Sequence, residues 1–221
     1  DFRTVIIMLD DKDDAQVIFE SLNYRGTPLL ASDLIRNHAF LRADQNREDV
    51  EKIYNDEWSK FEDKFWTAED WQGRLVKPRM EFFFANFLSC STGGEVNQSR
   101  IYQEYLEWVE YRKHEMNVKD EMHFIMKHAD LYRVLVAPTG ESDLVDFARF
   151  LSAFDVTIAF PLIMAIYAND ELDMDRKSEM LLDLESYMVR RAICGRTPKS
   201  YNKIFLHAIR ELRSKSINPT N

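Results

Sequence analysis

Glycine and proline are scarce in this chain, with 6 of each among its 221 residues. Tight turns between neighbouring strands depend heavily on these two residues, so their scarcity favours long helices over a many-stranded sheet. Hydrophobic residues make up 45% of the chain, and a chain of this length and composition can bury a substantial core. We therefore predict an all-α fold, in which the helices pack as a bundle-like array.

One segment near the N-terminus departs from this pattern. Thr4–Leu9 reads Thr-Val-Ile-Ile-Met-Leu, which is rich in β-branched residues and almost continuously apolar. Such a run predicts a buried strand. A single strand cannot satisfy its own edges, so we expect this one to be left over from a sheet that begins upstream. On this interpretation the chain is a fragment of a longer protein.

Apolar residues recur at helical spacing through the rest of the chain. The pattern predicts a buried central helix over Leu75–Ser89, where three consecutive phenylalanines occur. Gly195 is the expected left-handed stop of one helix, and Thr197-Pro198 is the expected start of the last one. The predicted helices span about residues 15–24, 30–41, 50–61, 75–89, 99–114, 119–135, 143–153, 156–169, 174–194 and 198–214.

Basic residues are concentrated at the C-terminal end of a chain whose formal net charge is -9. Between Arg190 and Lys215, eight lysines and arginines accompany the single acid Glu211. This stripe is either a solvated helix face or a surface that follows the phosphates of DNA. The candidate DNA-binding residues are Arg190, Arg191, Arg196, Lys199, Lys203 and Arg210.

Arg191 is unusual within this stripe because it continues an apolar helix face. Leu184, Tyr187 and Met188 define that face at helical spacing. A guanidinium there needs an anionic or carbonyl partner, since leaving it buried and unpaired costs several kcal/mol. Arg191 is therefore either a structural ion pair or helix-end clamp, or a contact with a ligand or a neighbouring domain.

The turn Asn23-Tyr24-Arg25-Gly26 places an amide, a guanidinium and a glycine within four residues. Arginine offers paired donors, and glycine lets the backbone approach an anion closely. The turn is therefore either a helix C-cap or part of an anion site.

No arrangement of residues in the sequence indicates a metal site or a catalytic centre. The histidines lack the HExxH spacing, and His123 and His128 do not share a helix face well. Clustered acids such as those at Asp170–Asp175 are interpreted as solvated faces and helix caps. We therefore predict no catalytic residues, no metal site and no cofactor within this fragment.

Two segments resemble one known family. Phe19–Leu29 reads Phe-Glu-Ser-Leu-Asn-Tyr-Arg-Gly-Thr-Pro-Leu, and Asp33–Asn37 continues as Asp-Leu-Ile-Arg-Asn. Glu185–Gly195 reads Glu-Ser-Tyr-Met-Val-Arg-Arg-Ala-Ile-Cys-Gly, and the likeness extends through Tyr201–Phe205. In this order, with a helical middle between them, the segments resemble GmrSD-type restriction proteins. The N-terminal domain of that family, long known as a domain of unknown function, has a ParB/sulfiredoxin-like core.

The resemblance implies a nucleotide-dependent endonuclease that defends bacteria against phage and foreign DNA. The nucleotide-hydrolysis motif of the family, DGQQR, is expected upstream of Asp1, and its nuclease histidines are expected downstream of Asn221. An NTP and a divalent metal are therefore expected for the full-length protein, whereas this fragment alone is expected to be inactive.

The resemblance also assigns roles to a few residues. Asn23, Arg25 and Gly26 match the Asn-x-Arg-Gly turn of the family, so they are expected to bind the nucleotide. Arg190 and Arg191 match paired arginines near the junction with the nuclease.

The leading hypothesis is a helical connector between the NTPase core and the HNH-like nuclease of a GmrSD-like restriction protein. Residues 1–42 are expected to end the ParB-like core, residues 43–215 to form the helical domain, and residues 216–221 to be a disordered tail. The expected partners are DNA and a nucleotide, a second copy of the chain is a further candidate, and a cytoplasmic location without a membrane partner is expected. The alternative is a non-catalytic helical scaffold for protein interaction or oligomerisation.

Overall fold

The computed structural model describes residues 29–112, 114–196 and 200–217. The expected strand Thr4–Leu9, the first expected helix and the turn Asn23–Gly26 lie outside the described residues. Lys199 and the expected helix start Thr197-Pro198 also lie outside them.

Most of the described residues are helical, so the prediction of a mainly helical fold is confirmed. None of the described helices is both long and apolar enough to cross a lipid bilayer. The α-helices are α2 (Ala31–Gln45), α3 (Val50–Asp56), α4 (Lys64–Thr67), α5 (Arg79–Thr92), α6 (Ile101–Arg112), α7 (Val118–Val136), α8 (Asp143–Phe154), α9 (Phe160–Ala168), α10 (Met174–Ile193) and α11 (Tyr201–Ile217). Two short 3₁₀ helices, η1 (Trp58–Glu62) and η2 (Thr157–Ala159), and two strands, β1 (Glu69–Gln72) and β2 (Leu75–Pro78), complete the described elements.

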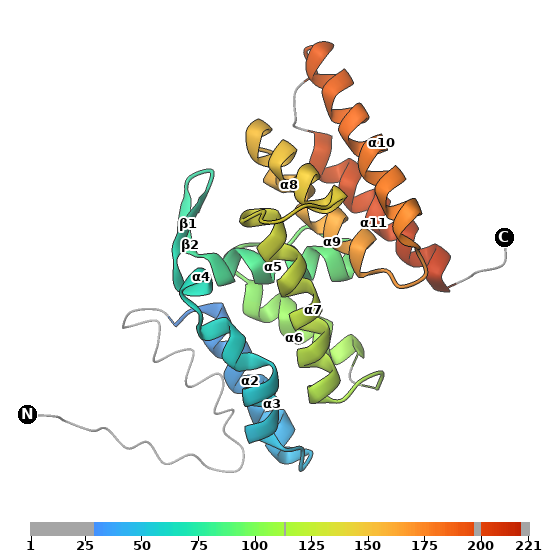
Figure 1. Ribbon diagram of the computed structural model, residues 1–221. Coiled ribbons are helices and arrows are strands. Elements are labelled where there is room, and N and C mark those ends of the chain that lie inside the picture. The colour runs from blue at the N-terminus through green and yellow to red at the C-terminus, as the bar shows by residue number, and fades with distance from the viewer. Residues whose placement is uncertain (1–28, 113, 197–199, 218–221) are drawn as a thin grey trace, which may run out of the picture.

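The hairpin of β1 and β2 corrects the prediction of an all-helical body after the N-terminal strand. The strands pair antiparallel, and Gln72 lies opposite Leu75 across a turn in which Gly73 has a φ of +62°. Leu75–Pro78 is therefore a strand and not the first turn of the predicted helix. Pro78 supplies the reason, because proline disfavours the helical conformation of the residue before it and stands at the N-cap of α5. Figure 1 shows the hairpin standing out from the helical body.

Two predicted helices are interrupted near their ends. Residues 50–61 form α3 and η1, which are separated at Glu57, where the backbone leaves the helical conformation with a φ of -121°. This break turns Trp58 and Phe61 into the core. The predicted helix over residues 156–169 starts as η2, and α9 follows with Pro161 in its first turn.

The core is centred on α5, as the phenylalanine-rich segment predicts. Phe82, Phe83, Phe84 and Phe87 are fully buried. Aromatic rings from η1, α4 and α7 lie beside Phe83, and α9 also packs against α5. Figure 1 shows α5 crossing the middle of the molecule, with α6 and α7 beside it. Every face of α5 is in contact with protein over most of its length. Because no face meets solvent there, the helix lacks the polar stripe of a surface helix.

The N-terminus of α2 is capped from a distance. Leu30 stands at the N-cap position and has no side chain that can accept a hydrogen bond. The buried carboxylate of Glu81, on α5, accepts hydrogen bonds from the backbone N–H groups of Ala31 (3.2 Å) and Ser32 (2.8 Å) instead. A negative charge at a helix N-terminus also interacts favourably with the helix dipole. α2 is therefore held onto α5 at its first turn.

The expected domain boundary between residues 42 and 43 falls within α2. This helix packs against α5, α6 and α7, which belong to the expected helical domain. α11 ends at Ile217, so its last two residues overlap the expected tail. The division into residues 1–42, 43–215 and 216–221 stays a prediction.

His128 makes the stability of this core depend on pH. Its ring is 2% exposed, packs against Phe124 and Phe87, and forms a 2.8 Å hydrogen bond between Nδ1 and the carbonyl oxygen of Phe124. Burial, with smaller contributions from Lys127 and Arg112, lowers the pKa of His128 to about 4. The unfolded chain binds a proton at this side chain below about pH 6.5, whereas the folded chain does so only near pH 4. The free energy of unfolding must therefore fall as the pH decreases from about 6.5 to 4.

Replacing His128 with phenylalanine is expected to remove part of this pH dependence. When the pH is lowered from 7 to 4.5, the free energy of unfolding of His128→Phe should fall by about 2–3 kcal/mol less than that of the wild-type chain. Urea denaturation at each pH measures this difference. His207→Gln, a change at an exposed histidine, is the matched control and should keep the wild-type slope. Equal slopes for His128→Phe and the wild type would contradict the assignment.

Candidate functional site

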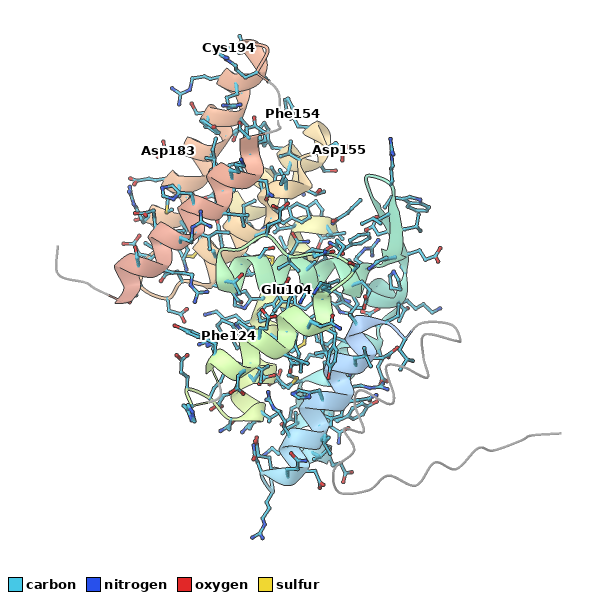
Figure 2. All side chains as sticks on the ribbon, turned by 180° about the vertical axis from the view of Figure 1, so that it is seen from behind. Glu104, Phe124, Phe154, Asp155, Asp183 and Cys194 are labelled. Atoms are coloured by element: carbon cyan, nitrogen blue, oxygen red, sulfur yellow. The ribbon has the colours of Figure 1, made fainter. Side chains whose placement is uncertain are left out.

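The second family-like segment forms the end of α10, the following turn and the start of α11. Figure 1 shows α10 and α11 running in opposite directions at one side of the molecule, and Figure 2 shows Cys194 at the tip that they form. Gly195 has a φ of +63° and donates to the carbonyl of Ala192 (3.0 Å), while Arg196 donates to the carbonyl of Arg191 (2.9 Å). This paired arrangement is a Schellman motif, so the prediction that Gly195 ends the helix is confirmed.

Arg191 joins the two helices at this tip. Its Nη2 donates to Ser200 Oγ at 2.8 Å, and its guanidinium lies 5.5 Å from the ring centre of Tyr187 and 5.3 Å from that of Tyr201. Stacking on two aromatic rings suits arginine better than lysine, because the guanidinium is planar and weakly hydrated. Of the two roles considered for Arg191, a structural clamp at the helix end or a contact with a ligand or neighbouring domain, this geometry corresponds to the clamp. A contact between Arg191 and DNA stays a prediction.

Three of the candidate DNA-binding residues surround the same tip and are exposed. They are Arg190 in the last turn of α10, Arg196 in the turn and Lys203 in the first turn of α11. Arg190 Nε donates to the carbonyl of Ser186 in its own helix at 3.1 Å. None of the three forms an ion pair with an acidic side chain among the described residues. Their charges are therefore available to an external anion.

Arg210 lies two turns farther along α11 and has a structural role. Its Nη1 donates to the carbonyl oxygen of Gly93 at 2.6 Å, where α5 ends with Gly93 at a φ of +67°. A Cβ at this glycine would lie 2.6 Å from Cγ of Arg210, so the two residues are packed closely. Arg190, Arg196 and Lys203 are thus exposed in the last turn of α10, the following turn and the first turn of α11. A contact between Arg210 and DNA stays a prediction, and Lys199 lies outside the described residues.

A second group of polar side chains, not predicted from the sequence, lines a cavity of about 500 Å³ between α2, α6 and the start of α7. The lining residues are His38, Arg42, Asn46, Leu106, Trp108, Val109, Glu110, Arg112, His114, Met116, Val118 and Glu121. They come from two stretches far apart in the sequence, residues 38–46 and 106–121, and follow no known spacing. The sequence carries one sign of this group, because His38 shares one side of the predicted helix over residues 30–41 with Leu34, Ile35 and Leu41.

Glu121 organises the inner wall of this cavity. Its side chain is 4% exposed, forms an ion pair with Arg42 and accepts a hydrogen bond from the hydroxyl of Tyr105. Burial and the Glu121 carboxylate raise the pKa of Tyr105 well above its ordinary value of 10, so the hydroxyl stays protonated and donates. Burial, and then the charge of Arg42, lower the pKa of His38, so this ring is neutral at pH 7. The wall presents a fixed guanidinium and a neutral imidazole.

The described residues contain no group of three or more histidine, cysteine, aspartate or glutamate side chains placed to hold a metal ion. Cys90 is buried and Cys194 is exposed, and the two are unbonded. Burial raises the pKa of the Cys90 thiol to about 12, so this cysteine is not a reactive thiolate at neutral pH.

Comparison with protein-family models gives no match, and comparisons with curated proteins and with solved structures give no significant match. The assignment to the GmrSD-type family therefore depends on the two sequence segments alone, and it stays a hypothesis.

Proposed function

We propose that this chain is the helical connector of a GmrSD-like, nucleotide-dependent DNA restriction protein. Residues 1–42, with the turn of Asn23, Arg25 and Gly26, would end an NTPase core. The helical domain would join this core to an HNH-like nuclease domain. The NTP and the divalent metal of the reaction would belong to the full-length protein. The two family-like segments occur in the sequence in the order that this arrangement requires.

The observation that carries the proposal is the exposed basic tip of α10 and α11. Arg190, Arg196 and Lys203 are all exposed where α10 ends and α11 begins, on a chain of net charge -9. Ion pairs do not neutralise them within the described residues. Lysine and arginine side chains that neutralise phosphates release counterions from DNA, which is the main source of non-specific affinity. The tip also lies within and next to the segment that resembles the junction with the nuclease.

The packing of the helices supports a mechanical role. α2 contains the end of the first family-like segment, Asp33–Asn37, and is capped by Glu81 on α5. α5 packs against α9, and α9 packs against α11. A movement imposed at α2 would thus reach the basic tip through helices that pack directly against one another.

Charge reversal at the tip tests the proposal. The triple variant Arg190→Glu, Arg196→Glu and Lys203→Glu should lower the affinity for a 20-bp DNA duplex about tenfold or more at low salt, measured by fluorescence anisotropy. The slope of log affinity against log salt concentration should also decrease. The tip variant changes only exposed side chains, so its thermal stability should match that of the wild type.

The matched control changes three other exposed basic residues by the same total charge. Lys52→Glu, Lys64→Glu and Arg74→Glu lie on α3, α4 and the hairpin turn, away from the tip. This control should keep the DNA affinity within about twofold of the wild type. An equal loss in both triple variants would show only a net-charge effect and would contradict a DNA interface at the tip.

The scaffold function remains the second candidate because several large apolar side chains are exposed. Trp71 is 67% exposed on the hairpin, and Leu182 and Ile193 are 66% and 81% exposed on α10. Side chains of this kind are typical of interaction surfaces when they gather in a patch. A chain that self-associates in sedimentation velocity and does not bind DNA at low salt would favour this function over the connector.

A further inference from the structure

The outward face of α10 carries a regular apolar stripe. Leu182, Ser186, Val189 and Ile193 follow one another at spacings of four, three and four residues, which places them on one side of the helix. Leu182 is 66% exposed and Ile193 is 81% exposed, whereas another face of the same helix packs against α8 and α9. Figure 1 shows α10 at the edge of the molecule. Single exposed apolar residues are common, but a stripe with this spacing is typical of a helix that packs against another helix.

Oppositely charged side chains flank the stripe on one side. Asp183 and Arg190 are seven residues apart, so they project from nearly the same side of α10, next to the stripe. Both are exposed, and Figure 2 labels Asp183. Neither residue forms an ion pair among the described residues. The stripe is thus accompanied by an acid and a base that are both available to a partner.

A second copy of α10 in the antiparallel direction matches both charges. A two-fold axis that passes between Ser186 and Tyr187 leaves Asp183 and Arg190 equally far from the axis. Rotation about this axis reverses the helix but keeps each flank on the same side. Asp183 of each copy therefore lies opposite Arg190 of the other. A parallel pair would instead bring the basic ends of the two helices together, where like charges repel.

The same register also matches the apolar stripe. Leu182 of one copy falls at the level between Val189 and Ile193 of the other. Ser186 lies next to the axis, where its small side chain allows the two helices to approach closely. Leu182 also lines a groove of about 340 Å³ between α8 and α10, together with Phe147 and Phe150, so the apolar surface continues from the stripe onto α8.

We propose that α10 joins this chain to a second copy of itself as an antiparallel helix pair, in which Asp183 of each copy pairs with Arg190 of the other. The stripe covers only about three helical turns, so the dimer is weak and forms at micromolar concentrations. The inference names the surface and the partner that the scaffold function would use, and it does not depend on the connector function.

Sedimentation velocity of the wild-type chain tests whether the dimer forms. Between about 5 and 500 µM the sedimentation coefficient should rise from that of a monomer to that of a dimer, in a reversible manner. A chain that stays monomeric over this range would overturn the proposal. DNA affinity is measured at nanomolar protein, far below the concentration at which the dimer forms, so this result leaves the connector function untouched.

A charge exchange tests the register and the direction of the helices. Asp183→Arg and Arg190→Asp each place like charges opposite one another at two symmetric contacts, so each should raise the Kd of the dimer about tenfold. The double variant restores opposite charges in exchanged positions, and its Kd should return to within about threefold of the wild type. Both residues are exposed, so thermal stability should stay near the wild-type value. A double variant that dimerises no better than the single ones would contradict the antiparallel pair.

Substitutions in the stripe test which surface is used. Leu182→Gln with Ile193→Gln should raise the Kd about a hundredfold, because the central apolar contacts are lost. The matched control is Leu41→Gln with Trp71→Gln, which changes side chains that are 56% and 67% exposed on α2 and the hairpin. This control should keep the Kd within about twofold of the wild type. If only the control variant lost the dimer, the chain would associate through another surface: the scaffold function would stand, and the role of α10 would be wrong.

Discussion

Replacing Phe83 with alanine is expected to lower the free energy of unfolding by about 3–5 kcal/mol. Phe83 is fully buried, and its ring lies 5.2–5.6 Å, centre to centre, from those of Phe84, Trp66, Phe61 and Tyr132. Alanine would leave a cavity that these rigid rings cannot fill, and it would also remove the aromatic pair interactions. For a domain of this size, the loss corresponds to a fall of roughly 6–20 °C in Tm.

Thermal and urea denaturation followed by circular dichroism measure this effect. Trp71→Ala is the matched control, because it also removes a large aromatic side chain, but one that is 67% exposed on the hairpin. Its effect should stay within about 0.5 kcal/mol. If Phe83→Ala lost no more stability than Trp71→Ala, the aromatic cluster on α5 would not be the centre of the core.

Replacing Glu121 with alanine is expected to cost a similar amount, about 3–5 kcal/mol, for an electrostatic reason. The substitution leaves the guanidinium of Arg42, whose side chain is 20% exposed, without its anion and the buried hydroxyl of Tyr105 without an acceptor. Both groups would remain desolvated, and leaving a buried polar group unsatisfied costs more than the paired contact contributes. Urea denaturation at neutral pH measures the loss.

A second variant separates this explanation from a packing defect. Replacing all three partners at once, as Arg42→Met, Tyr105→Phe and Glu121→Leu, removes every buried polar group of the set while keeping most of its volume. Apolar replacement of a buried ion pair is often neutral, so the triple variant should recover most of the stability lost in Glu121→Ala. A triple variant less stable than Glu121→Ala would show that the polar contacts themselves are favourable.

The fold was largely predictable because it follows from local patterns. The apolar spacing around Leu181 and Met188 predicts α10, and both side chains are buried on the expected face. Asp173 accepts a hydrogen bond from the N–H of Arg176 as a helix cap, and Gly195 ends the same helix. Such signals lie within a few residues of the structure that they determine.

The hairpin and the cavity do not follow from apolar spacing. Leu75 and Val76 are apolar like the phenylalanine run that begins at Phe82, so periodicity alone did not separate β2 from α5. The local sign of this boundary is Pro78, which stands between the two elements. Arg42 and Glu121 are 79 residues apart, and each looks like an ordinary charged residue near a helix end. Their pairing depends on how α2 and α7 pack, which no local pattern encodes.

The contact between Arg210 and Gly93 has a consequence for how the protein is made. The two residues are 117 positions apart, and Arg210 closes the carbonyl end of α5, the central helix. Ribosomes add about 5–20 residues per second, so Gly93 is synthesised roughly 6–23 s before its partner exists. During this time the carbonyl oxygen of Gly93 lacks the hydrogen bond from Arg210, while the helices that precede α5 can already pack. α11 thus completes a part of the core that is synthesised much earlier, and nascent chains arrested before residue 210 are expected to expose that end of α5.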